Sequence, residues 1–231
     1  MVTPKKNPTV KPLRKKEKRD PAATREALLR AGAEMFAEAG YDGVRVEALA
    51  ERSGVNKAMI NYHFGGKRQL YVAVIRSAFS ALLARVEELR RSSDPPPELL
   101  RQFIDSFAAL VQRRRPGFPA LVIREALSPS DVSSEVIPLM IRVLLGVREI
   151  LERGMRDGSL RQVDPTLVYL NLIGGLAFFF ATEPLRRRVR DQLPVSIEPP
   201  SADAYVRYVQ QLVARGLAPE SPVAADQGAK P

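Results

Sequence analysis

Apolar residues recur three and four positions apart along most of the chain, a spacing typical of one buried face of an α-helix. The longest such pattern predicts a helix from Lys67 to about Arg91. This helix should end at the segment SSDPPP, residues 92–97, because consecutive prolines cannot continue a helix. No stretch alternates apolar and polar residues as a half-buried strand does. We therefore predict an all-α protein.

The other helices are predicted from the same periodicity and from residues that begin or end helices. Asp20 and Pro21 form an N-cap followed by a proline in the first turn, and Gly40 should end the helix that they begin. The further helices that we expect cover residues 21–38, 46–54, 56–64, 99–114, 118–127, 134–156, 165–181 and 202–215. Residues 185–201 are rich in proline and predict a connection without regular structure.

Two short predicted helices, 46–54 and 56–64, are joined at a glycine in the pattern of a helix-turn-helix motif. Gly54 suits a turn with positive φ, and Asn56 is placed to cap the second helix by accepting a hydrogen bond from its first turn. Val55 and Ile60 should hold that helix against the core. The side chains then left to point outward are those of Lys57, Ala58, Met59, Asn61, Tyr62 and His63. A polar and basic set of this kind suits nucleic-acid binding.

The composition removes several classes of chemistry. The 231 residues include no Cys and a single His, which excludes disulfides, thiolate catalysis and Cys-ligated zinc. We expect no metal and no cofactor. The longest apolar run, Val168 to Ala181, is shorter than the roughly 20 residues that span a bilayer. No apolar segment follows the N-terminal Lys and Arg residues, so we expect no secretory signal and a cytoplasmic protein.

The net charge of +10 is concentrated at the N-terminus, where residues 1–20 hold eight Lys and Arg residues against two acidic ones. A basic segment with so few apolar side chains cannot offset its chain entropy by burial, so we expect a disordered arm. Such arms lie along DNA phosphates or in a minor groove. A solubilising tail explains the composition equally well.

The segment from Thr24 to Tyr71 resembles the DNA-binding domain of the TetR family of bacterial transcriptional regulators. The resemblance is carried by AEMFAEAGY, LAERSGV and INYHFGGK, residues 33–41, 49–55 and 60–67, and by the long helix that follows. NYHFGGK and LVIREALSPS, residues 61–67 and 121–130, look most like the CecR branch, within the AcrR-like regulators. The resemblance implies three N-terminal helices that bind DNA, a larger helical domain that binds a small effector, and a homodimer.

Individual roles follow from the family's motif. The resemblance places at base-facing positions Lys57, Ala58, Met59 and Asn61, and at phosphate-contacting positions Tyr62, His63 and Lys67. The chain departs from the motif at Arg45, where the family often has Thr, and at Asn61, where it often has Tyr. Arg45 cannot cap the helix that it precedes, but it can pair with a phosphate. The amide of Asn61 suits the N6 and N7 edge of adenine.

Three of these features could have a different role. His63 could be a packed core residue or a general base, but no carboxylate or nucleophile pattern accompanies it, so phosphate contact is favoured. Tyr62 could pack against the protein instead of DNA. The segment GGKR, residues 65–68, lacks the spacing of a phosphate-binding P-loop.

The second half of the chain is larger than is needed to hold a DNA-binding domain together, so we expect a ligand cavity there. The candidate effector-binding residues are Phe103, Phe107, Phe118, Arg124, Tyr169, Asn171 and Phe178. In this set Arg124 would supply charge for an anionic group. Most aromatic residues at helical spacing are ordinary core residues, however, and Arg124 could instead pair with Glu125.

The predicted helix 165–181 is apolar nearly all round and must be buried on all sides. The resemblance implies that it forms a four-helix dimer interface with 202–215 and the same two helices of a second copy. A central position in the core of one monomer explains its composition almost as well.

We therefore predict a non-enzymatic, dimeric regulator, most often a repressor, that a small molecule releases from a palindromic double-stranded operator. Its expected parts are a basic arm (1–20), a helix-turn-helix domain (21–66), an effector-binding and dimerisation domain (67–216) and a disordered tail (217–231). The alternative is an architectural protein that coats DNA through its basic arm and has no effector.

Overall fold

A computed structural model describes residues 20–114, 117–127, 133–192 and 198–220. These residues are helical with short connections and contain no strand, which confirms the all-α prediction. The elements are α1 Pro21–Gly43, α2 Val46–Ser53, α3 Ala58–Phe64, α4 Lys67–Arg91, α5 Pro96–Ala109, a π-helical turn η1 Leu110–Arg114, α6 Phe118–Leu127, α7 Ser133–Asp157, α8 Pro165–Ala181, α9 Glu183–Gln192 and α10 Ala202–Leu217. The predicted basic arm, apart from Asp20, and the tail from residue 221 lie outside the described residues.

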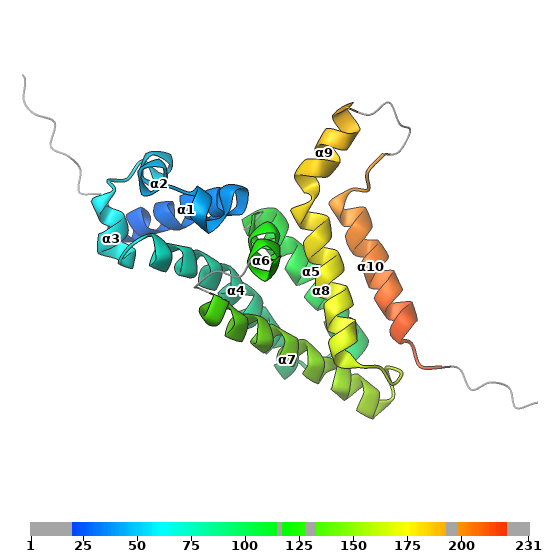
Figure 1. Ribbon diagram of the computed structural model, residues 1–231. Coiled ribbons are helices and arrows are strands. Elements are labelled where there is room, and N and C mark those ends of the chain that lie inside the picture. Colours follow the sequence, from blue (N-terminus) through cyan, green and yellow to red (C-terminus); the bar gives the residue numbers. More distant parts are fainter. Residues whose placement is uncertain (1–19, 115–116, 128–132, 193–197, 221–231) are drawn as a thin grey trace, which may run out of the picture.

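The first three helices sit at one end of an elongated molecule, and α4 runs from them into the body (Figure 1). One face of α4 packs against α1 and α3, and farther along it packs against α5, α6 and α7. Ten residues of α4 are buried, including Leu70, Ile75 and Leu82. One continuous apolar core therefore joins the two ends of the molecule, and α4 contributes buried residues along its whole length.

The helix ends follow the local signals. The carboxylate of Asp20 accepts a hydrogen bond of 3.0 Å from the backbone N–H of Ala22, as expected of an N-cap. Gly40 leaves the helical conformation with a φ of 72°, so it interrupts α1 as predicted, although a further turn continues to Gly43. The predicted bounds of α4, α6 and α8 are those observed.

Two predicted segments were wrong. The helix expected over 99–114 ends as an α-helix at Ala109 and continues as η1. Residues 185–192, expected to be an irregular connection, belong to α9. This helix begins with Glu183 and Pro184, both favourable in a first turn, and Arg187 pairs with Glu183 one turn back. Because α9 buries none of its residues, it carries no apolar period from which to predict it.

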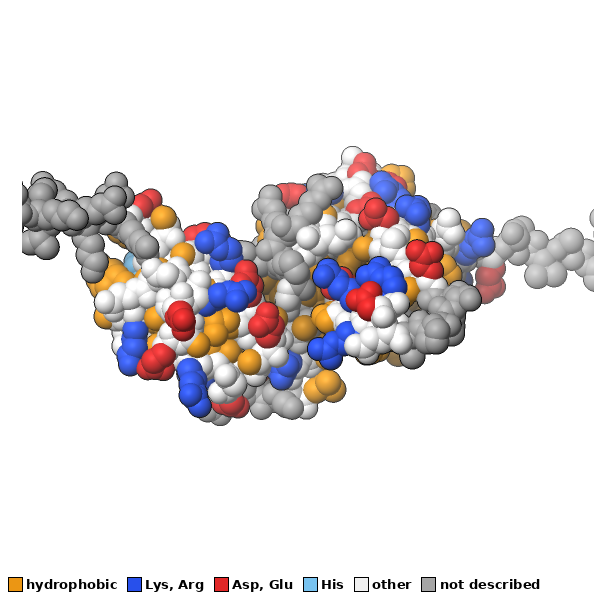
Figure 2. Space-filling view, turned by 90° about the horizontal axis from the view of Figure 1, so that it is seen from above, with side chains coloured by type: hydrophobic (Ala, Val, Ile, Leu, Met, Phe, Trp, Pro, Cys, Tyr) orange, Lys and Arg blue, Asp and Glu red, His pale blue; other side chains and the backbone are white. Residues whose placement is uncertain are grey.

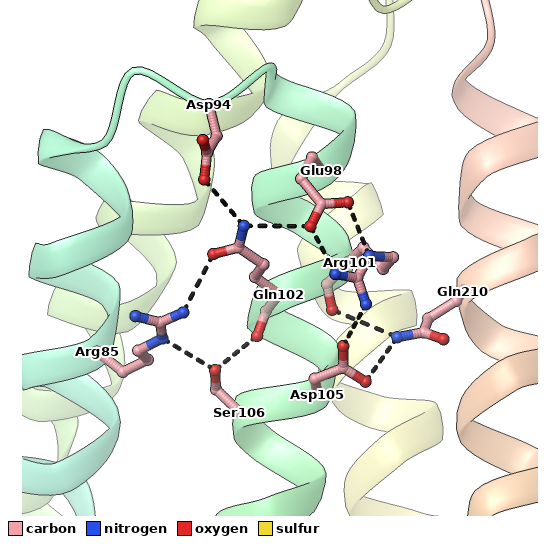
Figure 3. Close-up of polar contacts among 8 residues, drawn as sticks. All are labelled: Arg85, Asp94, Glu98, Arg101, Gln102, Asp105, Ser106 and Gln210. Atoms are coloured by element: carbon pink, nitrogen blue, oxygen red, sulfur yellow. Dashed lines mark hydrogen bonds and ion pairs between the residues drawn. The ribbon is translucent and has the colours of Figure 1, made fainter.

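A polar network fixes α5 between α4 and α10 (Figure 3). Arg85 of α4 donates hydrogen bonds of 3.1 Å to Gln102 and to Ser106. On the other side of α5, Gln210 of α10 donates to Asp105 at 2.7 Å. Polar side chains, in addition to the apolar core, therefore fix the positions of α4, α5 and α10 relative to one another.

α4 is long and apolar enough to cross a bilayer by length and composition, and α8 with α9, bent by 50°, passes the same test as a pair. Half of the most apolar window of α4 is buried inside the protein, as in the core helix of a globular domain. These features are weak support for a membrane span.

Candidate nucleic-acid interface

The turn between α2 and α3 has the geometry of a helix-turn-helix. Gly54 adopts a left-handed conformation with a φ of 63°, and its N–H donates to the carbonyl oxygens of Ala50 and Glu51. A non-glycine residue is strained in this backbone conformation, so the turn is specified locally by the sequence. After the turn, Val55 and Ile60 are buried, as predicted, and they hold the back of α3 against the core.

The two ends of α3 are set by Asn56 and two glycines. The side-chain oxygen of Asn56 accepts a hydrogen bond of 2.9 Å from the N–H of Ala58, which confirms its capping role, although regular helix begins only at Ala58. Gly65 and Gly66 have positive φ values of 79° and 125° and turn the chain into α4. α3 is therefore a short rod with defined ends.

The outer face of α3 presents most of the side chains expected there. Those of Lys57, Ala58, Asn61 and Tyr62 are exposed, and Tyr62 reaches 76% exposure. An exposure so high rules out the packing explanation for Tyr62. Met59 differs from expectation, because it is half-buried and packs partly against the core.

His63 is half-buried, and its ring meets that of Tyr62 edge to face at 5.0 Å between centroids. The described residues contain no group of three or more His, Cys, Asp or Glu side chains that could hold a metal ion. The structure therefore places His63 at the rim of the outer face of α3, beside an exposed tyrosine.

An acidic side chain, that of Glu47, lies next to the basic residues on the α2–α3 surface. The ammonium group of Lys57 lies 2.8 Å from Glu47 in the first turn of α2. The hydrogen bond from Lys57 lowers the pKa of Glu47, which therefore stays ionised. Arg45, directly before α2, is exposed and makes no side-chain capping bond, as expected. The contact between Glu47 and Lys57 depends on the angle between α2 and α3, so the sequence alone does not indicate it.

Two cations lie against aromatic rings at the edges of this surface. The Lys67 ammonium, at the start of α4, sits 4.3 Å from the centre of the Tyr41 ring. The guanidinium of Arg25 in α1 lies 5.2 Å from the centre of the Phe64 ring at the end of α3. Arg25 is exposed and was not singled out from the sequence, because nothing local indicates which face of α1 meets α3.

The first helix, α1, meets α4 and α6 at an aromatic cluster. The ring of Tyr71 in α4 packs against those of Phe36 and Tyr41, with centroids 4.9 Å and 5.2 Å away. Its hydroxyl donates a 2.8 Å hydrogen bond to Glu125 of α6, and both side chains are buried. Burial and the neighbouring carboxylate raise the pKa of Tyr71, so it remains a donor.

The charged candidate for effector binding, Arg124, lies at this same junction. It is exposed, and its guanidinium donates a 3.3 Å hydrogen bond to the carbonyl oxygen of Glu38. A Cβ at residue 40 would lie only 2.9 Å from its Cδ, so Gly40 makes room for this contact. Arg124 therefore joins α6 to α1.

The remaining effector candidates are divided between the core and the surface of the described helices. Phe103, Phe107 and Phe118 are buried in the core. Tyr169 is buried as well, which raises its pKa to about 12. Phe178 is 65% exposed, and the Asn171 amide donates to Leu167 one turn back on the exposed side of α8.

An apolar groove of about 590 Å³ runs between α8 and α10. Asn171 lines it together with Leu167, Tyr208 and Leu212. These three side chains are 57–60% exposed, and on α8 Leu170 and Phe178 are 58% and 65% exposed. The prediction that α8 is buried on all sides therefore fails within one chain, which leaves an unpartnered apolar surface on α8 and α10.

The described fold and the α2–α3 surface define a helix-turn-helix DNA-binding protein, and comparison with known proteins agrees. A profile described as "Bacterial regulatory proteins, tetR family" matches residues 28–74. The transcriptional repressor KstR2 of Mycolicibacterium smegmatis is 30% identical over 158 residues, which are 64% of this chain and 74% of that protein. The transcriptional repressor NicS of Pseudomonas putida is 27% identical over 84% of this chain and 92% of its own length.

Among solved structures, the TetR family regulator PfmR of Thermus thermophilus is similar, with a TM-score of 0.59 and 26% identity. The similarity covers 81% of this chain and 97% of that one. The chain belongs to the TetR family and is a DNA-binding transcriptional regulator. Its place in the CecR branch is not tested by these similarities and stays a prediction.

Proposed function

We propose that the protein is a homodimeric repressor that binds a near-palindromic operator and leaves it when a small molecule binds the C-terminal helices. The observation that carries this proposal is the outer face of α3, where exposed polar side chains are backed by a fully buried Ile60. A rod of this kind can enter a major groove without losing its packing. We place the protein in the cytoplasm and assign it no catalytic role.

In this proposal Lys57, Ala58, Met59 and Asn61 face bases, while Arg45, Tyr62, His63 and Lys67 contact phosphates. The half-burial of Met59 limits it to contact through the end of its side chain. Residues 21–66 form the DNA-binding domain and residues 67–216 the effector-binding and dimerisation domain, with α4 shared between their cores.

Dimerisation is supported by the exposed apolar surface of α8 and α10, which a second copy would cover. Two recognition helices would then meet successive major grooves about 34–36 Å apart, or a multiple of it. Because both half-sites must be met together, a small change in their separation costs several contacts, each worth about 1–3 kcal/mol. Repositioning α4 and α6 against α1 would produce such a change.

The proposal is tested by selecting DNA from a random pool with purified protein. We expect a near-palindromic consensus and a preference of about 10³ or more over random DNA at matched salt. A triple substitution of Lys57, Met59 and Asn61 by alanine should abolish that preference in a protein that still folds. An unchanged preference would refute the assignment of α3 as the reading helix.

The DNA-coating alternative is not favoured, because the similar proteins NicS and KstR2 are transcriptional repressors by name. The same selection separates the two, since a coating protein would lose sequence preference at physiological salt. Deleting residues 1–19 should flatten the dependence of log affinity on log salt if the arm contacts phosphates. If the slope of log affinity against log salt did not change, the arm would not contact phosphates.

A further inference from the structure

A second hollow lies beside α9, which projects from the body of the molecule (Figure 1). It is a cleft of about 770 Å³ between η1, the end of α8, α9 and residues 198–202. This volume lies within the range of about 300–1,000 Å³ that small-molecule sites occupy. Figure 2, which views the protein from above, shows basic side chains gathered with a few acidic ones over α9.

One of the cleft's three arginines is held in place without a carboxylate. The guanidinium of Arg186 stacks over the Phe179 ring at 3.8 Å from its centre. Its Nη1 donates to the hydroxyl of Thr182 at 2.9 Å and to the carbonyl oxygen of Phe179. These partners are neutral, and Arg186 forms no ion pair with any residue that the structure describes. Arg186 is therefore a partly buried cation that neutral groups hold in place, and Glu183, which pairs directly with Arg187, acts on it only through longer-range attraction.

The acidic residues of the cleft do not cancel its cations. Glu183 forms an ion pair with Arg187, so it is already engaged. Arg190 has only a loose contact of 3.8 Å with its neighbour Asp191. With Glu183 paired, Glu198 is the one carboxylate among the described lining residues that is left to balance Arg186 and Arg190. The excess charge is positive and suits an anionic group, which arginine binds through paired N–H donors.

Apart from Gln112 and Ser201, the uncharged part of the described lining is apolar. Val111 of η1 and Phe180 of α8 are nearly fully buried residues whose edges reach the cleft, and Pro199 adds a rigid apolar wall. A cationic rim beside an apolar wall accommodates a molecule with an anionic end and an apolar body.

The cleft is also connected to the DNA-binding helices. Val111 and Gln112 belong to η1, the π-helical turn that leads from α5 toward α6. Short π-helical segments occur often at functional sites. α6 in turn contacts α1 through Arg124 and α4 through Glu125. A ligand that shifts η1 would therefore act on the helix that supports the junction.

We infer that this cleft is the effector site and that it takes a small amphipathic organic anion. The inference rests on the proposed function, because it names the site and the ligand class of the effector. It replaces the aromatic set expected from the sequence, most of which lies in the core or at the junction.

The test uses calorimetric titration of the full-length protein with decanoate, decyl phosphate and 1-decanol, which share an apolar chain and differ in charge. Both anions should saturate a site, and decanol should bind at least about tenfold more weakly, the size of one lost charge-assisted contact. Binding of decanoate alone or of decyl phosphate alone would support the site and identify the headgroup. Equal binding of decanol, or no binding of either anion, would overturn the inference.

Charge reversal supplies the matched variants. Arg190→Glu should weaken anion binding at least about tenfold, whereas Arg188→Glu, on the same helix but outside the cleft lining, should leave it unchanged. Gln112→Glu places a negative charge in the cleft from η1 and should weaken binding as well, without altering α9. Equal effects of the Arg190 and Arg188 substitutions would contradict the assignment.

Operator affinity measured on the same samples separates the two claims. Specific DNA binding that decanoate and decyl phosphate leave unchanged would overturn the effector role of the cleft and leave the regulator intact. Absence of any specific DNA binding would instead count against the proposed function. We expect specific binding that weakens at least about tenfold when an anion saturates the cleft.

Discussion

The hydroxyl of Tyr71 donates a 2.8 Å hydrogen bond to Oε2 of Glu125, joining the helix that follows the DNA-binding domain to α6. Tyr71 is 1% exposed and Glu125 is 7% exposed, so the bond lies inside the protein. From the neighbouring position of α6, Arg124 reaches the carbonyl oxygen of Glu38 in α1. A short stretch of α6 therefore contacts both α1 and α4 at the point where the two ends of the molecule meet.

Removing this hydrogen bond should destabilise the protein. In Tyr71→Phe the buried carboxylate of Glu125 loses a donor, and we expect the free energy of unfolding to fall by about 1–3 kcal/mol. The same change at Tyr62, which is 76% exposed, should stay within about 0.5 kcal/mol. Urea-induced unfolding measures both. Equal losses would show that the Tyr71 hydroxyl contributes nothing specific.

Glu47 should restrain DNA binding. It places a carboxylate on the DNA-facing surface and holds Lys57 at 2.8 Å, so Glu47→Gln should tighten DNA binding several-fold at low salt. Both partners are more than half exposed, so solvent screens the pair and the stability of the fold should hardly change. Glu51→Gln, at an exposed position of α2, is the matched control. DNA binding by fluorescence anisotropy that responds equally to both changes would indicate only a general charge effect.

The apolar surface of α8 and α10 should be the dimer interface. Leu170→Glu or Leu212→Glu would place an unpaired charge where a second copy packs, and each position occurs twice in a symmetric interface. We expect dimer affinity to fall by at least about tenfold in sedimentation experiments, with loss of operator binding. Leu127→Glu, at a residue 79% exposed at the end of α6, should leave the dimer intact. Dimers that persist in both α8 and α10 variants would place the interface elsewhere.

Stability should decline in acid through Glu98. The hydrogen bond from Arg101, followed by one from Gln102, lowers the pKa of Glu98 from its ordinary value of 4.5 to about 2. A carboxyl group with a lowered pKa stabilises the folded state above its unfolded pKa, and this contribution is lost as pH falls from about 4.5 to about 2. Because the Glu98 side chain is 38% exposed, solvent screening makes the contribution modest.

Thermal melts of the protein and of Glu98→Gln check this expectation. The melting temperature of Glu98→Gln should fall less steeply between about pH 5 and pH 2.5 than that of the unaltered protein. Parallel curves would mean that Glu98 has no part in acid unfolding.

The helices of this protein could be predicted where local residues mark their ends. Gly66 and the Ser92–Pro97 break bound α4, and the observed range matches. α9 could not be found in this way, because its stabilising contacts are ion pairs and the stacking of Arg186 on Phe179. Apolar periodicity reports burial, and a helix without buried residues has none.

The candidate DNA-reading surface rests on stronger local sequence signals than the candidate effector site. Gly54, Asn56 and Ile60 act within one short motif, so their spacing in the chain already determines which side of α3 faces outward. The effector residues were chosen by type alone. Aromatic residues at helical spacing suit a core and a cavity equally, and here Phe103 and Phe107 belong to the core.

The sequence by itself determined the all-α class, the caps and turns of the DNA-binding helices, and the residues that α3 presents, because those features depend on neighbours a few positions away. Only the tertiary structure decided that Tyr71 meets Glu125 and that Arg124 joins α1. It also decided that Arg186 stacks on Phe179 beside a cleft. Such pairings depend on the angles at which whole helices pack, and these angles are set by the sum of many distant contacts.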